Sequence, residues 1–266
     1  MITATYEDDL ARVRLLVDGL PANGSTTLTI ERSTDSVRWR AVRGGTAIDI
    51  DAGAGNRLDD YEFAPGVSNQ YRVRTFSPVG VQLATESTTV TPVIDRVWLK
   101  SIARPFLNRK VVVRDYTAVT RRSRAGLFEI PGRSYPVRVG DVASSRSWTL
   151  EVLTYDPVEA RSLEYLIESG DVVLVQVPPE YDIPGGYVGL GDMSKGRISR
   201  TLADGRRQFS LPMTEVAAPP ASVVGYAGTW EMLLAQFGSW TAVMSAFPTW
   251  ADMAEYVTDP TTVIVP

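Results

Sequence analysis

The feature that most constrains the fold is the segment 146–178, which has the pattern of a strand, a helix and a second strand. Apolar residues first recur at every second position and then at helical spacing, which is a change from one face of an extended segment to one side of a helix. They are Trp148, Leu150 and Val152, followed by Ala160, Leu163, Leu166 and Ile167. This pattern predicts a strand that leads directly into a helix over 157–169.

The residues at the two ends of this helix also fit the prediction. Asp156 can accept hydrogen bonds from the free amides of the first turn, and Pro157 has no amide hydrogen that would be left unpaired there. Glu159 can complete a capping box, and Gly170 tolerates the left-handed conformation that closes many helices. The run 172–177 is apolar at both alternating phases, so we expect a central strand that is covered on both faces.

Composition excludes several kinds of chemistry. The 266 residues are 44% hydrophobic and include no cysteine and no histidine. Disulfides, thiolate nucleophiles and histidine-based catalytic or zinc sites are therefore excluded, and the length favours two domains or three small units. No apolar run approaches the roughly 20 residues that span a bilayer, and the N-terminus is acidic where a signal peptide is basic. We expect neither membrane embedding nor export by a signal of the chain's own.

Positive charge is concentrated in one segment. The chain carries a net charge of −4, yet residues 94–135 contain ten basic and three acidic groups. The favoured interpretation is an arginine-rich joint whose charges are solvated or paired with acidic surfaces of the same or a neighbouring subunit. Contact with nucleic acid is the alternative, but few aromatic residues lie among the arginines to stack on bases, so no specific nucleic-acid partner is expected. The interface candidates in this segment are Arg121, Arg122 and Arg124.

Residues 1–93 have the pattern of a β-sandwich, because short alternating or apolar runs are separated by turn-forming residues. The stretch 61–80 resembles a fibronectin type III domain in its turn, its sixth strand with a corner tyrosine, and the loop that follows. The matching positions are Pro65, Gly66, Tyr71, Val73, Arg74 and Gly80. The tryptophan typical of the second strand is absent, with Leu15 to Val17 in its place. Such a module is a spacer or adhesive unit, and no function follows from its fold.

Residues 94–218 are expected to form a mainly β domain with the one helix 157–169. The segment 117–141 is interpreted as a long basic loop or a hairpin. The order of motifs resembles the minor tail proteins of long-tailed phages that infect actinobacteria, and in particular their tail-tube and distal-tail β-sandwich. These motifs are VWLKSIARPFLNRKVVV, TYDP, ESGD, GGYVGLGDMS and FSLPMTEV.

The resemblance implies a structural component of a phage tail tip rather than an enzyme. It implies a closed ring, a hexamer more than a trimer, which joins the tail tube to the tip or host-recognition apparatus. The implied partners are further copies of the chain and the tail tube, tape measure and tip or hub proteins. The implied location is the virion, after synthesis in the cytoplasm of the bacterial host.

The last unit, 219–266, contains a repeat with a spacing of ten residues. Each copy places a Ser or Thr before a tryptophan and apolar residues at helical positions after it, which predicts three short helices. Helices of about eight residues are unstable alone in water, so they are expected either to cap the chain's own core or to act as a strap on another subunit. We expect the tryptophans to be buried in the assembled particle. The interface candidates here are Trp230, Phe237, Trp240, Phe247 and Trp250.

Other chemistry has little support in the sequence. Asp49, Asp51, Asp59 and Asp60 could gather around calcium, but they lack the spacing of a calcium-binding loop, and exposed loop carboxylates are the favoured interpretation. No catalytic residue, metal site or cofactor is therefore predicted. Two alternatives to a structural role stay open. One is an extracellular carbohydrate- or receptor-binding module, with a host-surface glycan as the partner of residues 1–93, and the other is a cell-wall hydrolase that uses carboxylates.

Overall fold

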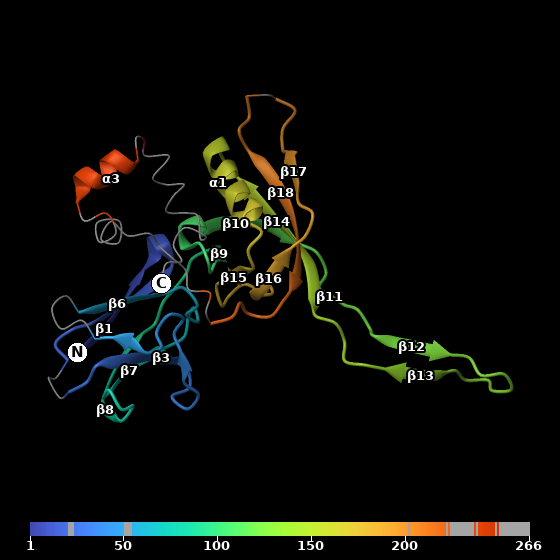
Figure 1. Cartoon of the computed structure of the whole chain (residues 1–266). Coiled ribbons are helices and arrows are strands. Elements are labelled where there is room, and N and C mark those ends of the chain that lie inside the picture. The colour runs from blue at the N-terminus through green and yellow to red at the C-terminus, as the bar shows by residue number, and fades with distance from the viewer. Residues whose placement is uncertain are drawn as a thin grey trace.

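The structure, a computed structural model, describes residues 1–20, 24–50, 55–201, 203–221, 223, 237, 239–247 and 249. It is mainly β, as the sequence predicts. Figure 1 shows a layered N-terminal unit, a central β-unit that carries one long helix, and a hairpin that projects away from both.

The N-terminal unit consists of two antiparallel sheets that enclose one core. The first sheet has the order β1 (Ile2–Glu7), β2 (Arg12–Val17) and β6 (Asn56–Asp60), with the 3-10 turn η1 (Asp8–Leu10) between β1 and β2. The second has the order β4 (Arg40–Ala41), β3 (Thr27–Ser33), β7 (Asn69–Phe76) and β8 (Gln82–Val90), and β5 (Ile48–Asp49) also pairs with β3. Burial alternates along β2 and β7, so one face of each strand supplies the core.

Asp59 and Asp60 lie on strand β6, so the interpretation of them as exposed loop carboxylates is wrong. Asp60 is almost fully buried, and it accepts hydrogen bonds from the Tyr71 hydroxyl at 2.7 Å and from Arg32 at 2.5 Å. Asp59 accepts a bond of 2.5 Å from Arg12. Among the residues described, no group of three potential acidic ligands could hold a metal ion, and Asp51 lies outside them. These carboxylates therefore bind side chains of their own unit.

The central unit is a closed barrel rather than the expected sandwich. Its six strands are antiparallel, and pairing from Ser147↔Thr214 to Thr154↔Arg207 closes the ring. The order around the barrel is β14 (Arg146–Thr154), β10 (Arg109–Tyr116), β9 (Val97–Ser101), β15 (Val173–Gln176), β16 (Gly186–Leu190) and β18 (Arg207–Glu215). The short strand β11 (Thr120–Arg121) pairs with β14, and the short strand β17 (Ser194–Arg197) pairs with β18. The 3-10 turn η2 (Pro105–Leu107) links β9 to β10. Closure joins strands far apart in sequence, so local periodicity does not reveal it.

Helix α1 (Pro157–Glu168) begins where the sequence predicts and ends one residue before the end of the expected range 157–169. The Asp156 side chain accepts from two amides of the first turn, whereas the Glu159 carboxylate accepts from the amide of Tyr155, one residue earlier than in a capping box. Gly170 has a φ of 68°, the left-handed conformation that closes the helix. The face that packs on the barrel consists of Ala160, Leu163 and Leu166.

Strands β9 and β15 form a barrel wall against which the N-terminal unit packs. All residues of both strands are buried. On β9, Val97 and Leu99 belong to the barrel core, whereas Trp98 between them belongs to the core of the N-terminal unit. On β15, the Gln176 side chain donates to the carbonyl of Phe63 at 2.6 Å. A strand covered on both faces is thus present, and a second domain covers its outer face.

Lys100 of β9 lies at the centre of this junction, which we call the seam. Its side chain is fully buried, and its ammonium donates to the carbonyls of Ala11 at 2.5 Å and Tyr61 at 3.1 Å and to the amide oxygen of Gln176. Burial lowers the pKa of Lys100 to about 7, although the negative charge of Asp60 opposes this shift. The interpretation of residues 94–135 as solvated or ion-paired cations is therefore wrong for Lys100.

A second polar cluster holds the chain where it leaves the barrel. Arg43 binds both carboxylate oxygens of Glu62, at 2.9 and 3.1 Å, and it also donates to three backbone carbonyls in the segment 219–223. Glu62 in turn accepts a hydrogen bond from the hydroxyl of Tyr187 on β16. One guanidinium thus connects the N-terminal unit, the barrel and the start of the C-terminal tail.

Candidate assembly surfaces

Residues 117–145, which we call the arm, connect β10 to β14 and leave the body of the protein. Their outer part is the antiparallel hairpin β12 (Ala125–Phe128) and β13 (Val137–Gly140), and β11 pairs the base of the arm with β14. Figure 1 shows the arm projecting from the barrel on the side away from the N-terminal unit. The segment 117–141, expected to be either a long loop or a hairpin, is a hairpin.

The tip of the arm contains a sharp turn encoded by Pro131 and Gly132. The amide of Arg133 donates to the carbonyl of Ile130 at 3.0 Å, and Gly132 has a φ of 83°. Proline at the second position and a left-handed glycine at the third are typical of a type II turn. The turn therefore helps to reverse the chain between the two arm strands.

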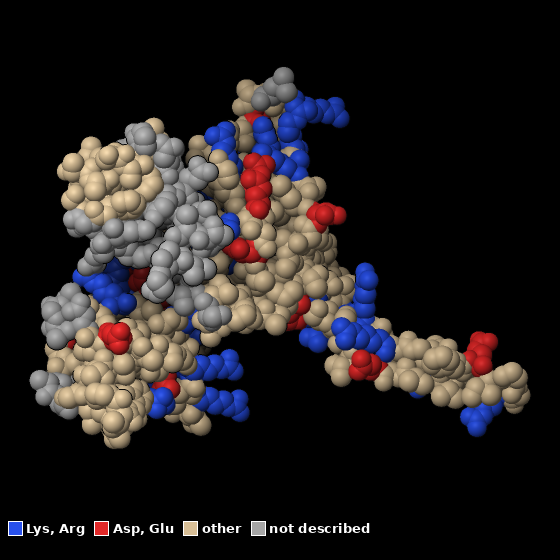
Figure 2. Space-filling model, viewed as in Figure 1, with Lys and Arg blue, Asp and Glu red and all other residues tan. Residues whose placement is uncertain are grey.

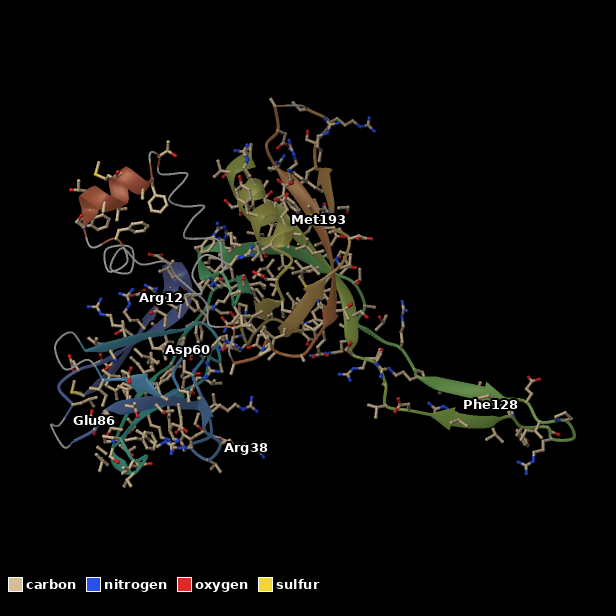
Figure 3. The ribbon with its side chains drawn as sticks, in the orientation of Figure 1. Arg12, Arg38, Asp60, Glu86, Phe128 and Met193 are labelled. Atoms are coloured by element: carbon tan, nitrogen blue, oxygen red, sulfur yellow. The ribbon has the colours of Figure 1, made fainter. Side chains whose placement is uncertain are left out.

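One face of the arm is apolar and uncovered. Gly126 pairs with Val139 and Phe128 with Val137, and opposite residues on an antiparallel pair share a face. The Phe128 ring lies over Gly126, where an added β-carbon would come within 3.0 Å of it. Phe128 is 57% exposed and Val139 is 60% exposed. Figure 3 shows Phe128 far out on the arm, away from the labelled residues of the two domains.

This geometry suits binding to a protein surface. A two-stranded hairpin is marginally stable in water when nothing covers it, and contiguous exposed apolar surface marks interaction sites. The arm carries further exposed apolar side chains on its other face and around its tip and base. They are Val119, Leu127, Ile130, Tyr135 and Val142.

The predicted interface arginines lie at the base of the arm. Arg121 is on β11, Arg122 and Arg124 follow it toward β12, and all three are exposed. In the part of the chain that the structure describes, none of them pairs with a carboxylate, and the arm as a whole has five arginines and two acidic residues. By contrast, Lys110 near the seam binds Asp95 at 2.5 Å, and this hydrogen bond raises the pKa of Lys110.

The basic segment therefore has two parts, one near the seam where Lys110 is paired with a carboxylate and one on the arm where, among the described residues, the arginines are not. The interpretation of solvated or paired cations holds for Lys110, which is paired with Asp95, and for the exposed arginines of the arm, but not for the buried Lys100. Figure 2 shows the arm as a narrow projection with basic side chains near its base and its tip. Unpaired cations beside apolar side chains suit a partner surface that is apolar and acidic.

The structure describes one of the three predicted C-terminal helices. Helix α3 (Trp240–Ala246) has the expected serine cap, because the Ser239 hydroxyl accepts from the amide of Ala242 at 3.3 Å. The rings of Phe237 and Phe247 lie edge to face with centroids 5.4 Å apart. Trp240 is 45% exposed, so the described structure covers it only in part, and its burial in a particle stays a prediction. The other two helices, with Trp230 and Trp250, fall outside the described residues.

The structure does not bring the two sets of predicted interface residues together. The arginines lie on the arm, and α3 lies on the opposite side of the molecule (Figure 1). The sequence interpretation missed the apolar face with Phe128, Val137 and Val139. The alternating run Val137-Arg138-Val139 and the turn residues Pro131-Gly132 before it are the sequence signals of this face.

Comparison with known proteins adds no assignment. No protein-family model matches the chain, and no curated protein sequence is similar to it. Within the described ranges, every helix is too short or too polar to cross a membrane.

Proposed function

We propose that this protein is a non-enzymatic structural component of a phage tail tip and that it assembles into a closed ring. The single observation that carries this proposal is the arm, whose apolar face with Phe128 and Val139 is uncovered by the chain itself. In the proposed ring, the arm of each copy packs on the body of the next copy. A contact between two different surfaces forms a ring when its rotation closes, and the resemblance favours six copies over three.

Each part of the chain has a role in this proposal. The N-terminal unit is a fibronectin type III-like module, supported by its two facing sheets and by Tyr71 in the strand matched to that family. The barrel is the tail-tube or distal-tail-like domain, and α1 is its one helix. The tail is a set of helical repeats, of which α3 is the second. The expected partners are the tail tube, tape measure and tip or hub proteins of the virion.

The test is the mass and symmetry of the purified full-length protein. We expect light scattering to give six copies and electron-microscopy class averages to show a ring. The double change Phe128→Asp and Val139→Asp is expected to give single copies, because it places charge on the apolar face of the arm.

The matched control is Val79→Asp with Val81→Asp, since these valines are also exposed but lie on a loop of the N-terminal unit. The control is expected to keep the ring. A wild-type protein that stays a single copy at high concentration contradicts the proposal. Equal loss of assembly in both double variants removes the arm as its cause.

A further inference from the structure

A polar pocket lies at one end of the barrel, between α1 and the β17–β18 hairpin. Its volume is about 200 Å³. Figure 2 shows basic side chains gathered at this end of the molecule, with acidic ones beneath them. The lining residues are Pro157, Ala160, Arg161, Glu164, Lys195, Gly205 and Arg207.

From this pocket we infer a binding site for a single oxyanion, either a phosphate group or a carboxylate. The lining has three cations and one carboxylate, so its formal charge is +2. A water molecule occupies about 30 Å³ in the liquid, so the pocket has room for a tetrahedral anion with some of its water. The inference is independent of ring formation, because all lining residues belong to one chain.

Arg207 is positioned to bind such a group. One terminal nitrogen, Nη1, donates to the carbonyls of Asp204 and Arg206, both at 2.7 Å. The backbone carbonyl of Arg207 accepts from the Thr154 hydroxyl, which ties the residue to β14. Its remaining donors, Nε and Nη2, have no partner among the described residues. Those two nitrogens form the edge of a guanidinium that binds carboxylate or phosphate with two parallel hydrogen bonds.

The other charged residues of the pocket differ in their pairing. Lys195 is held across the pocket by Glu164 at 2.7 Å. Arg161, on the exposed side of α1, has no carboxylate partner in the part of the chain that is described. An incoming oxyanion would therefore meet two guanidinium groups without a direct carboxylate partner among the described residues, although Asp204 lies close enough to Arg207 to interact with it electrostatically.

The wall of the pocket depends on a close approach of two segments. Gly205 lies against the first turn of α1, where an added β-carbon would be 3.1 Å from Pro157. This contact brings the 204–207 segment, and with it Arg207, to the N-terminal end of the helix. The positive end of the helix dipole adds to the attraction for an anion, although Asp156 already occupies two of its amides.

The experiment is titration of the full chain with inorganic phosphate at constant ionic strength maintained with chloride. We expect saturable binding by calorimetry and a matching rise in the unfolding midpoint, because a ligand that binds the folded state stabilises it. Arg207→Lys keeps the positive charge but removes the two parallel hydrogen-bond donors, Nε and Nη2, so it should weaken phosphate binding about tenfold. Glu164→Gln removes the competing carboxylate and should strengthen binding about threefold.

The matched control is Arg197→Lys, on β17 but outside the pocket lining. It should bind phosphate as the wild type does. Acetate serves as the second probe. Competition with phosphate at similar concentrations assigns the pocket to carboxylates as well as phosphate, whereas failure to compete assigns it to phosphoryl groups. Unsaturable binding, or equal weakening by the Arg207 and Arg197 variants, overturns the inference.

Discussion

The seam and the arm both contain cations and large apolar side chains, but these residues differ in their burial and in their hydrogen-bond partners. At the seam, Lys100 is fully buried and three oxygens from three separate segments accept its hydrogen bonds. On the arm, the apolar face with Phe128 and the arginines near its base have no such partners within the described chain. Both regions combine cations with large apolar side chains. Within the described chain, those of the seam are buried and Lys100 is hydrogen-bonded, whereas those of the arm are exposed to solvent.

This difference separates stability from assembly. Substitutions at the seam should change the free energy of unfolding of one copy, because they disturb contacts already present. Substitutions on the arm should leave that free energy nearly unchanged and alter only association.

Lys100→Ala should destabilise the folded chain by about 3 kcal/mol, because it leaves buried oxygens without a donor and opens a cavity. Urea unfolding of wild type and variant measures the difference. Arg38→Ala is the control, since Arg38 is exposed on a loop of the N-terminal unit (Figure 3). A loss below about 1 kcal/mol would show that Lys100 does not hold the seam.

The stability of the wild type should rise with pH between about 7 and 10. The folded pKa of Lys100 is about 7, whereas an unfolded lysine titrates near 10.4, so the unfolded chain binds more protons in this window. The slope from this one group is at most about 1.4 kcal/mol per pH unit. Urea unfolding at several pH values measures it. Lys100→Met should remove this component, and an identical slope in that variant contradicts the prediction.

Arg43→Ala should cost about 1 to 2 kcal/mol and loosen the segment 219–223, whose carbonyls Arg43 holds. Hydrogen exchange followed by mass spectrometry should show faster exchange in peptides that contain this segment. Arg40→Ala on the exposed strand β4 should leave exchange there unchanged. Unchanged exchange in the Arg43 variant would mean that other contacts hold the tail.

Phe128→Ser should change the stability of a single copy by less than about 0.5 kcal/mol, because the ring is mostly in solvent. Urea unfolding at a concentration that favours single copies checks this, and light scattering at high concentration should show weaker assembly. A large stability loss in the single copy would show that the arm packs on its own chain and would remove the contrast with the seam.

The elements expected from local patterns are present where the pattern and the packing agree. Asp156 and Gly170 lie at the two ends of α1 as expected, and the run 172–177 contains the fully buried strand β15. The sequence could not show what covers β15, because Gln176 and Lys100 meet the N-terminal unit through contacts between distant segments. For the same reason the pairing of β14 with β18 was not visible, and a sandwich was expected instead of a barrel.

Less of the candidate assembly surface on the arm could be predicted from the sequence. Charge counting selected Arg121, Arg122 and Arg124, which lie at the base of the arm. The apolar face depends on which residues oppose each other across β12 and β13, and register depends on the turn at Pro131-Gly132 rather than on composition. Strand β6 was missed because its Asn-Arg-Leu-Asp-Asp sequence is polar, although Asp60 is buried against Tyr71 and Arg32.

The position of Arg43 has a mechanical consequence. Its guanidinium grips Glu62 and the start of the C-terminal tail, and Glu62 also binds Tyr187 on the barrel. Tension applied to the tail would therefore be transmitted to both large units at once, to the N-terminal unit through Arg43 and Glu62 and to the barrel through Tyr187. Part of such a load would pass from the tail to the N-terminal unit through this side chain, besides the part carried by the backbone from β18.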